Sequence, residues 1–529
     1  MKAKIIAFMA LTILSASCSS DFLDQEPKSS LTAAQAYGSL GKIEPVLLGA
    51  ITNWRNMQKD RAGLYTSLGT DEAQQGALQV TGDANQAGLD LYNGFLSQEN
   101  QAIGQLWNDR WPVIEVAAQS IRALGTNTED DSAKRDLLLG EASFLRATLM
   151  FELTQYWGEI PINDKAKSAE YGLKRQPLPL VYSYIVADLE RAVEKLPVTQ
   201  SNPAFPAKGV AQALLGKVYL YAPEASGYRD YNKAKQWFEQ VIKSGKYSLL
   251  PNYADVFSPD HANSSESLYE WQYTNNWPDN NQIQWQTGSR VLANMDQYAY
   301  FGGYDLILPT QYCYKDKTAG GIWEAGDTRK AASIRYDFTY KGVTPTLPAG
   351  FGGDELDPHI KKYEDIRVDG KQSFWNSGKN KAYIRYSDVL LNYAECLNEL
   401  GSTTEAESYV NQVRTRAFGG TLPAGMAWSG LSQTQFRDQI LDERMCEINA
   451  MFLNTIIRNN KNLFGSRAFE GWRRMDLIRT GKLVELVGAR NKWAKQNGTI
   501  AAFHNRYPIP IGEIKLNDEI GPEDQNSGY

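Results

Sequence analysis

The hydrophobic positions of this chain recur mainly with helical spacing. In residues 383–400, apolar side chains fall at intervals of three and four, at Tyr386, Leu390, Tyr393, Leu397 and Leu400. This spacing places them on one face of a helix. Gly401 follows directly, as expected for a residue that ends a helix. The pattern then predicts a second helix over roughly 403–417, so that the two would form a helical hairpin.

Helical pairs of the same kind are predicted earlier in the chain. They cover residues 206–221 with 231–244, and residues 134–157 with 181–196. Ala213, Gly216 and Ala394 are small and stand where two helices would approach closely. Repeated helical hairpins with short connections indicate a tetratricopeptide-like stack. The intervals between the pairs are irregular, so ordinary packed helical hairpins remain an alternative interpretation.

Residues 252–381 interrupt the helical pattern. Trp, Tyr, Gly, Asn and Pro are frequent there, and no long helical period is present. Residues 267–273 alternate like a short strand, and residues 275–281 have loop composition. We therefore predict a mainly α fold, in which a loop-rich, short-strand subdomain lies against a helical scaffold. The expected units are an N-terminal scaffold over 31–251, the aromatic subdomain over 252–381 and a C-terminal scaffold over 382–529.

The N-terminal residues predict export and lipid anchoring. Lys2 and Lys4 precede an apolar run that is too short to cross a bilayer, and small residues follow it. Leu14-Ser15-Ala16-Ser17-Cys18 is similar to a bacterial lipobox, in which the cysteine is acylated after residues 1–17 are removed. Residues 18–30 would then be the acylated Cys18 and a polar, acidic tether. Ordinary cleavage after Ser17, which leaves a free thiol, is the alternative.

Charge and composition exclude several classes of function. Removal of Lys2 and Lys4 with the signal changes the net charge from −6 to −8, and an acidic chain without a basic run is unsuited to nucleic acid. Cys313, Cys396 and Cys446 are too widely spaced for a metal knuckle, so we expect no metal site. No nucleotide or cofactor fingerprint is present, and we expect no cofactor.

Aromatic residues among polar ones mark a candidate binding surface. Sugar rings pack their C–H faces on Trp and Tyr, while their hydroxyls need polar partners. The candidates in the aromatic subdomain are Trp277, Trp285, Tyr298, Tyr300, Tyr304, Trp323 and Arg290; Asp71 and Tyr92 form a second patch. We expect Trp277 and Trp285 to be exposed and Trp271 to be core, and leave Tyr304 open. The alternative is that all these aromatics are core.

Charged residues near the C-terminus have helical spacing. Arg473, Asp476 and Arg479 lie three residues apart and share one face. With Glu443, Arg444 and Glu470 they are expected to form a partly buried ionic network that holds helices together. The alternative is a catalytic carboxylate–arginine site.

Motifs along the whole chain resemble those of the SusD/RagB family of outer-membrane nutrient-binding lipoproteins. The most specific one is residues 470–479, Glu-Gly-Trp-Arg-Arg-Met-Asp-Leu-Ile-Arg. Others are Cys18 with 22–24, 141–147 with 156–161, 213–220, 384–395, 443–448, 507–510 and 525–529. The resemblance implies four tetratricopeptide-like units with a ligand-binding subdomain. It also implies a partner, a SusC-like TonB-dependent outer-membrane transporter. The chain departs from the family in an insertion at 449–468.

These observations predict a cell-surface lipoprotein of the outer membrane that captures a glycan for the transporter without performing chemistry. The family also includes a peptide-capturing branch, so peptide is the alternative ligand. A glycoside hydrolase needs only two suitably placed carboxylates, and the many Asp and Glu residues keep that possibility open at the level of sequence.

Overall fold

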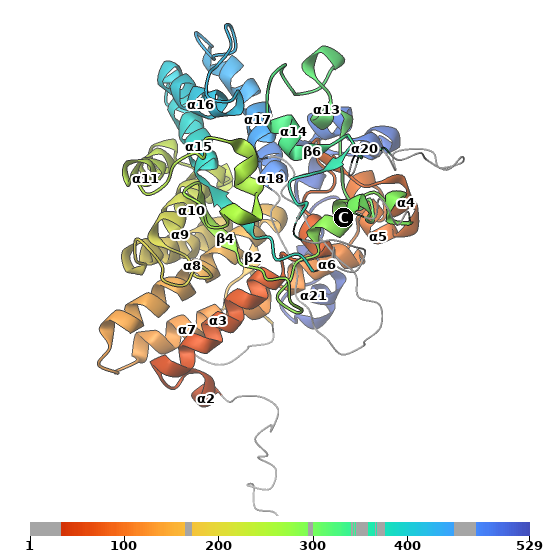
Figure 1. Cartoon of the computed structure of the whole chain (residues 1–529). Coiled ribbons are helices and arrows are strands. Elements are labelled where there is room, and N and C mark those ends of the chain that lie inside the picture. The colour runs from red at the N-terminus through yellow and green to blue at the C-terminus, as the bar shows by residue number, and fades with distance from the viewer. Residues whose placement is uncertain are drawn as a thin grey trace, which may run out of the picture.

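The computed structural model describes residues 33–163, 172–294, 300–339, 342, 344, 358–365, 367, 376–448 and 472–529. Cys18, Tyr298 and the insertion at 449–468, for which the sequence made predictions, lie outside these residues. Figure 1 shows that the chain has two sides, a column of helices and a loop-rich side that carries short helices and strands.

The helical column follows the order of the chain. Its members are α2 (Ala33–Tyr37), α3 (Leu40–Asn56), α7 (Trp111–Thr126), α8 (Ser132–Trp157), α9 (Leu178–Lys195), α10 (Lys208–Tyr221), α11 (Tyr231–Lys243), α15 (Tyr386–Glu399), α16 (Thr403–Ala417) and α17 (Gln433–Ile448). Neighbours pack successively, with α7 against α8, α8 against α9, α10 against α11 and α15 against α16 (Figure 1). The predicted helical hairpins and the mainly α fold are confirmed.

Local signals in the sequence account for the ends of these helices. The Asp131 carboxylate accepts a hydrogen bond from the backbone N–H of Lys134 and so caps α8, and Asp230 caps α11 in the same way. Gly401, with φ of +85°, follows α15 in the left-handed conformation that glycine adopts without strain. None of the described helices combines the length and the apolar character that crossing a bilayer requires.

One predicted close approach is essential to the packing of the column. A Cβ atom on Gly216 of α10 would lie 2.8 Å from a ring carbon of Phe238 on α11. Contacts that short do not occur between real side chains, so the hairpin requires glycine at this position. The sequence prediction of a small residue between two helices is confirmed here.

The strands form four two-stranded antiparallel sheets within the described residues. They pair β1 (Ala73–Gln74) with β5 (Leu308–Pro309), β2 (Ile160–Pro161) with β3 (Arg175–Gln176), β4 (Ser267–Trp271) with β8 (Lys381–Arg385), and β6 (Ile334–Arg335) with β7 (His359–Ile360). The strand predicted over 267–273 is confirmed. The helix predicted over 383–400 begins only at Tyr386, because residues 381–385 pair with β4.

Short helices complete the loop-rich side. They are α4 (Ala77–Gly82), α5 (Ala84–Leu91), α6 (Gln101–Asn108), α12 (Ile283–Thr287), α13 (Gln311–Tyr314), α14 (Arg329–Ser333), α18 (Trp472–Arg479), α19 (Gly488–Arg490), α20 (Lys492–Asn497) and α21 (Ile511–Leu516), with a π-helical turn at Leu483–Val487. Segments from both halves of the sequence therefore lie together here, as in the contact of α5 with α20.

An aromatic cluster joins the helical column to the loop-rich side. Trp54 of α3 is fully buried and contacts the rings of Tyr269, Trp271 and Tyr383 at centroid distances of 5.1 to 5.4 Å. Trp271 is 0% exposed, so its predicted core position is confirmed. The β4–β8 pair thus owes its place to aromatic packing against the first long helix.

The ionic network predicted near the C-terminus is confirmed in part and is buried, and Glu443 pairs with Arg329 and Arg414 instead. Asp476 pairs with Arg444 at 3.0 Å and with Arg479 at 2.6 Å, so α18 is tied to α17. Arg473 instead reaches Asp71 in the N-terminal part of the chain at 2.6 Å. Glu470 lies outside the described residues. The arginines of α18 hold distant segments of the chain together.

Glu141, in the middle of α8, should make stability depend on pH. Burial raises the pKa of this carboxyl from its ordinary 4.5 to about 8, although a hydrogen bond from Gln200 acts to lower the pKa. A raised folded-state pKa favours the folded protein below pH 4.5, and this contribution is lost as pH rises toward 8. We expect Glu141→Gln to raise the melting temperature at pH 8 more than at pH 5. Glu194→Gln, at a carboxylate that is 70% exposed, is the control and should shift neither. Equal melting-temperature shifts at both pH values would contradict the assignment.

Candidate functional site

The loops that carry the two candidate patches predicted from the sequence lie next to each other. The pairing of β1 with β5 places Ala73 opposite Pro309, and Thr310 donates its N–H to the carbonyl of Glu72 at 2.9 Å. Farther along, the side-chain amide of Gln79 on α4 donates to the carbonyl of Tyr304. The loops near residue 71 and those of the aromatic subdomain therefore lie side by side.

Trp277 is the most exposed tryptophan of the candidate set. Its side chain is 57% exposed, and the Lys59 ammonium lies 5.2 Å from the centre of its ring. Lys59 also donates to the carbonyl of Pro278 at 2.7 Å, and Asp279 pairs with Arg55 at 2.5 Å. These contacts fix the loop that carries the indole. The predicted exposure of Trp277 is confirmed.

Trp285 differs from Trp277, although both lie in polar sequence. Trp285 is 8% exposed, so its predicted exposure is wrong. It lies on α12, and its carbonyl accepts the N–H of Tyr304 at 2.9 Å, while its ring meets that of Tyr304 edge to face at 5.6 Å. A Cβ on Gly303 would lie 1.9 Å from the Trp285 carbonyl oxygen, so only glycine permits this approach. Trp285 supports the half-buried ring of Tyr304 from below.

Residues of α4 and of the loop after α3 complete the surface, and the sequence did not single them out. Arg61 donates to the Gln86 amide oxygen at 3.0 Å and lies within electrostatic reach of Tyr304, while burial lowers its pKa. Leu78 of α4 is 44% exposed. We call the surface made by Lys59, Arg61, Leu78, Gln79, Trp277 and Tyr304 the loop face. Lys59 and Arg61 are two residues apart, and this short segment contacts Trp277 at one end and approaches Tyr304 at the other.

The other candidate residues lie beneath the surface or beside it. Tyr92 is 1% exposed and receives a hydrogen bond from Arg474 at 2.7 Å, and Asp71 is 0% exposed and paired with Arg473. Trp323 is 1% exposed, and its indole N–H donates to the Cys313 carbonyl at 2.6 Å. Tyr300 is also buried, Arg290 is half-buried, and Tyr298 lies outside the described residues. A sugar ring stacks on an exposed aromatic face, and among the described aromatic candidates Trp277 and Tyr304 provide one.

The carboxylates close to the loop face already have structural partners. Asp83 accepts the backbone N–H groups of Asn85 and Gln86 as the N-cap of α5, and Asp279 pairs with Arg55. Within the described residues, no group of three His, Cys, Asp or Glu side chains is arranged to hold a metal ion. The arrangement suits recognition by stacking and hydrogen bonding.

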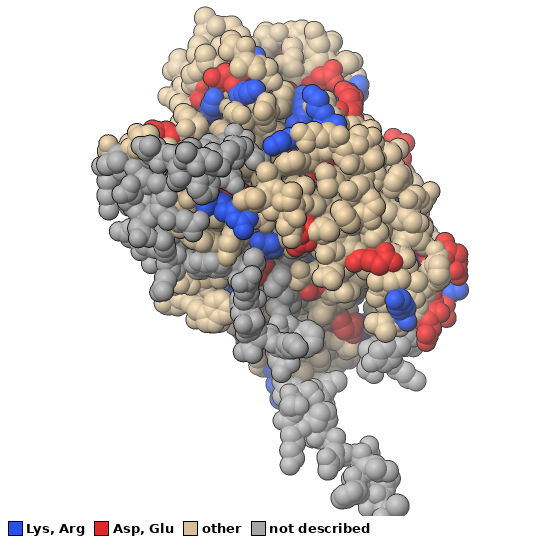
Figure 2. All heavy atoms as spheres, turned by 90° about the vertical axis from the view of Figure 1, so that its right-hand side faces the viewer, with Lys and Arg blue, Asp and Glu red and all other residues tan. Residues whose placement is uncertain are grey.

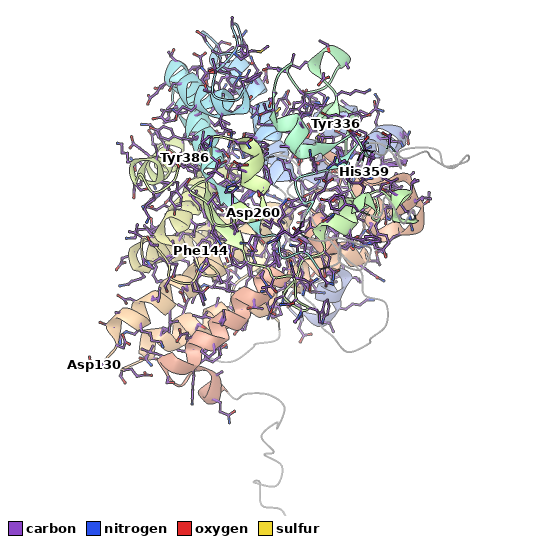
Figure 3. All side chains as sticks on the ribbon, in the orientation of Figure 1. Asp130, Phe144, Asp260, Tyr336, His359 and Tyr386 are labelled. Carbon is purple, nitrogen blue, oxygen red and sulfur yellow. The ribbon has the colours of Figure 1, made fainter. Side chains whose placement is uncertain are left out.

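The loop-rich side carries charges of both signs. In Figure 2, which shows this side, Lys and Arg are scattered with Asp and Glu among uncharged described residues. Tyr336 and His359 lie on it, whereas Phe144 and Tyr386 belong to the helical column (Figure 3). A mixed surface of this kind matches an uncharged ligand better than a strongly anionic one.

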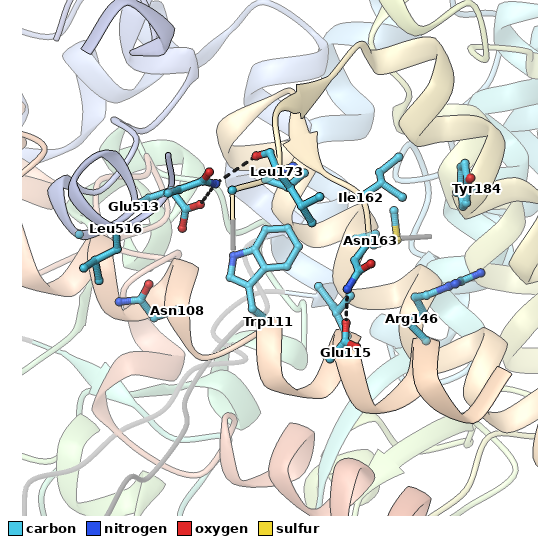
Figure 4. A pocket seen from close by; sticks show the side chains of 17 residues that line it. Asn108, Trp111, Glu115, Arg146, Ile162, Asn163, Leu173, Tyr184, Glu513 and Leu516 are labelled. Carbon is cyan, nitrogen blue, oxygen red and sulfur yellow. Dashed lines mark hydrogen bonds between the residues drawn. The ribbon is translucent and has the colours of Figure 1, made fainter. Parts of the chain in front are cut away.

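A cavity of about 340 Å³ lies elsewhere, between α7, α8, α9 and α21. Figure 4 shows Trp111 in its centre, with Glu115 accepting a hydrogen bond from Asn163 and with Leu173 above. Asn163 and Gly172 in its wall flank residues 164–171, which lie outside the described part of the chain. The cavity lies between the helical column and α21, and no residue of the loop face lines it.

Two family matches cover most of the chain. Residues 256–450 match the SusD family, and residues 21–220 match the family described as "Starch-binding associating with outer membrane". The chain belongs to the SusD family. The resemblance seen in its motifs is therefore confirmed.

Relatives of this SusD-family chain are similar to it over its full length. It is 28% identical over 547 residues to SusD-like protein P2 of Formosa agariphila, with 100% of both chains covered. A solved SusD homolog from Bacteroides thetaiotaomicron gives a TM-score of 0.75 at 21% identity, covering 94% of this chain and 98% of the other. Surface glycan-binding protein A of the same organism, in complex with laminarihexaose, gives 0.71 at 20% identity, covering 92% and 99%. These structures confirm the fold.

Proposed function

We propose that this protein is a cell-surface glycan-binding lipoprotein that captures an oligo- or polysaccharide without chemical conversion. It would then deliver the glycan to a TonB-dependent outer-membrane transporter. The observation that carries the proposal is Trp277, an indole that is 57% exposed and held by Lys59 beside a polar loop face. Membership of the SusD family and the glycan bound to surface glycan-binding protein A support the same ligand class.

The mechanism is stacking with hydrogen bonding. A sugar ring lies on the Trp277 face, and the Lys59 ammonium beside that ring donates to its hydroxyls. Individual contacts of this kind give affinities in the micromolar to millimolar range, about −4 to −8 kcal/mol. A polymeric ligand and a fixed partner raise the effective concentration. The lipid on Cys18 would keep the protein at the outer membrane, next to the transporter.

Calorimetric titration of the soluble protein, residues 19–529, tests this function. The ligands are hexasaccharides of β-1,3-glucan, α-1,4-glucan, xylan and mannan, an acidic glycan and a mixture of peptides, with product analysis of each mixture. We expect one glycan class to bind uncleaved. Trp277→Ala should weaken binding about tenfold or more, because loss of a central aromatic anchor costs over 1 kcal/mol.

Two variants control this experiment. Trp277→Phe keeps an aromatic face and should retain most of the affinity, while Leu516→Ala removes a side chain that is 79% exposed on α21 and should change nothing. Because Trp277 is exposed, its replacement should leave the melting temperature unchanged. Cleaved product would contradict capture without chemistry. Binding of peptides alone would replace the glycan by the alternative ligand of the family.

A further inference from the structure

A second pocket opens on the loop-rich side, near the C-terminus marked in Figure 1. It has a volume of about 600 Å³ and lies between the loop that follows α5 and the C-terminal segment. Residues 92–94 and 96–99 form one wall, and Thr499, Phe503, Gln525 and Tyr529 are among those that form the other. None of the residues of the loop face lines it.

Phe503 gives this pocket a rigid aromatic surface. Its ring is 36% exposed, yet its centroid lies 3.9 Å from that of His504 at an interplanar angle of 35°. It also meets the ring of Tyr529 edge to face at 5.1 Å, and the Tyr529 hydroxyl donates to the Arg506 carbonyl at 2.8 Å. Gly528 packs against Phe503 so closely that a Cβ would lie 2.3 Å from the ring. An aromatic face fixed before binding loses little entropy when a ligand stacks on it.

The side chains beneath Phe503 are fixed by hydrogen bonds, and none of them presents a charge to the pocket. His504 accepts the N–H of Ala501 through Nδ1 at 2.9 Å, and its carbonyl accepts from Arg474 at 2.6 Å. Burial and the nearby Arg474 lower the pKa of His504 to about 4, so the imidazole is neutral at physiological pH. Arg474 also donates to the hydroxyl of Tyr92, which forms part of the pocket wall.

Polar groups surround the aromatic surface. Glu99 accepts hydrogen bonds from Ser97 Oγ and from Gln98 Nε2, each at 3.0 Å, and it remains exposed to solvent. Asn93 adds a further hydrogen-bonding group to the lining, whereas Thr499 and Gln525 bond to neighbouring groups of the protein. The residues that line it, all of them described, include Glu99 but neither lysine nor arginine. A carboxylate without a neighbouring base in the lining repels anions and accepts hydrogen bonds from hydroxyl groups.

The geometry points to a second saccharide-binding subsite at Phe503, which takes a neutral sugar unit of the same polymer that the loop face binds. This inference rests on the proposed function, since it concerns the same class of ligand. The sugar stacks on the exposed face of Phe503, and its hydroxyls donate to Glu99 and exchange hydrogen bonds with Asn93. Two subsites on one chain bind a long polymer more tightly than either binds a short fragment, because the second contact is intramolecular.

Hydrogen–deuterium exchange of the soluble protein with the same hexasaccharides locates the subsite. We expect the binding glycan to protect peptides covering 92–99 and 499–506, in addition to 273–280 at the loop face. Phe503→Ala should remove the protection at 92–99 and 499–506 and leave the protection at 273–280. Glu99→Ala, at an exposed side chain, should weaken the subsite at least threefold, and its control Glu523→Ala, an exposed acid outside the lining, should not.

Each outcome separates the inference from the proposed function. Protection at 273–280 alone overturns the second subsite and leaves glycan capture at the loop face intact. Protection at 92–99 and 499–506 alone supports the subsite and overturns the role of Trp277. An absence of protection at both places with every hexasaccharide overturns both. Should Phe503→Ala lower the melting temperature, Glu99→Ala still decides, because its side chain supports no core packing.

Discussion

Replacement of Glu447 by glutamine is expected to lower the free energy of unfolding by about 3–5 kcal/mol, the range for breaking a buried ion pair. Glu447 lies at the end of α17 and is 0% exposed. Its carboxylate accepts hydrogen bonds from Arg416 at 2.6 Å, from Arg385 at 3.0 Å and from Arg329 at 3.3 Å. Glutamine keeps the shape but removes the charge, so these buried guanidinium groups lose their shared counterion.

The position of Glu447 explains why the effect should be large. The arginines that it pairs with come from α14, β8 and α16, so that one carboxylate connects these elements to α17. Glu266 also pairs with Arg385 and Arg416, but it cannot neutralise both. A buried charge without a partner costs far more than the pair contributes when intact.

Urea unfolding at pH 7, followed by circular dichroism, measures this effect. The control is Glu399→Gln, which removes the carboxylate paired with the 46% exposed Arg437. Exposed pairs contribute about 0 to 1 kcal/mol, so this variant should unfold near the wild-type midpoint. A Glu447→Gln protein as stable as the control would show that the network contributes no more than a surface pair.

The same carboxylate gives the prediction a pH dependence. Burial raises the pKa of Glu447, but Arg416, Arg385 and Arg329 outweigh it and hold the pKa far below its ordinary 4.5. A lowered folded-state pKa contributes stability above the unfolded value, and that contribution is lost as pH falls below it. The difference between wild type and Glu447→Gln should therefore be full at pH 7 and shrink below about pH 4.5.

Replacement of Asp71 by asparagine is expected to destabilise the fold by a similar amount, about 3–5 kcal/mol, without weakening ligand binding by the folded protein. The Asp71 carboxylate is 0% exposed and accepts two hydrogen bonds from Arg473, at 2.7 and 2.6 Å, and one from Arg490 at 2.8 Å. These contacts join the loop after α3 to α18 and α19, across most of the sequence. The loss of one carboxylate would leave both arginines without this partner.

Two measurements on the same variant separate the structural role of Asp71 from a ligand-binding role. Urea unfolding reports stability, and titration with the binding hexasaccharide at 15 °C reports affinity while the protein is folded. Asp279→Asn is the matched stability control, because Asp279 is 50% exposed in its pair with Arg55. A stable Asp71→Asn protein that has lost affinity would instead assign Asp71 to the ligand site.

The helical column could be predicted closely because its signals are local. The spacing of apolar residues from Tyr386 to Leu400, the aspartates that cap α8 and α11 and the glycine after α15 all act within a few residues of one another. The error at residues 383–385 has the opposite cause. Tyr383 packs in the Trp54 cluster, and its segment pairs with β4, more than one hundred residues earlier in the chain.

The candidate site could be predicted only in part. Trp277 and Trp285 lie in similarly polar sequence, but one is 57% exposed and the other 8%. The difference arises because α12 carries Trp285 against Tyr304 and Gly303, and no local pattern encodes that packing. Lys59 and Arg61 were missed for the same reason, since their proximity to the aromatic subdomain depends on how the loop after α3 meets residues 277–304.

The sequence by itself determined the family, the helical hairpins and part of the buried ionic motif. These follow from periodicity, caps and motif residues, which depend on near neighbours or on residue type. Only the tertiary structure decided which aromatic side chains face solvent, that Asp71 and Tyr92 are internal, and that Phe503 stands in a second pocket. The physical reason is that side-chain exposure is set by contacts between segments hundreds of residues apart, such as Arg473 with Asp71, and these contacts leave no local pattern in the sequence.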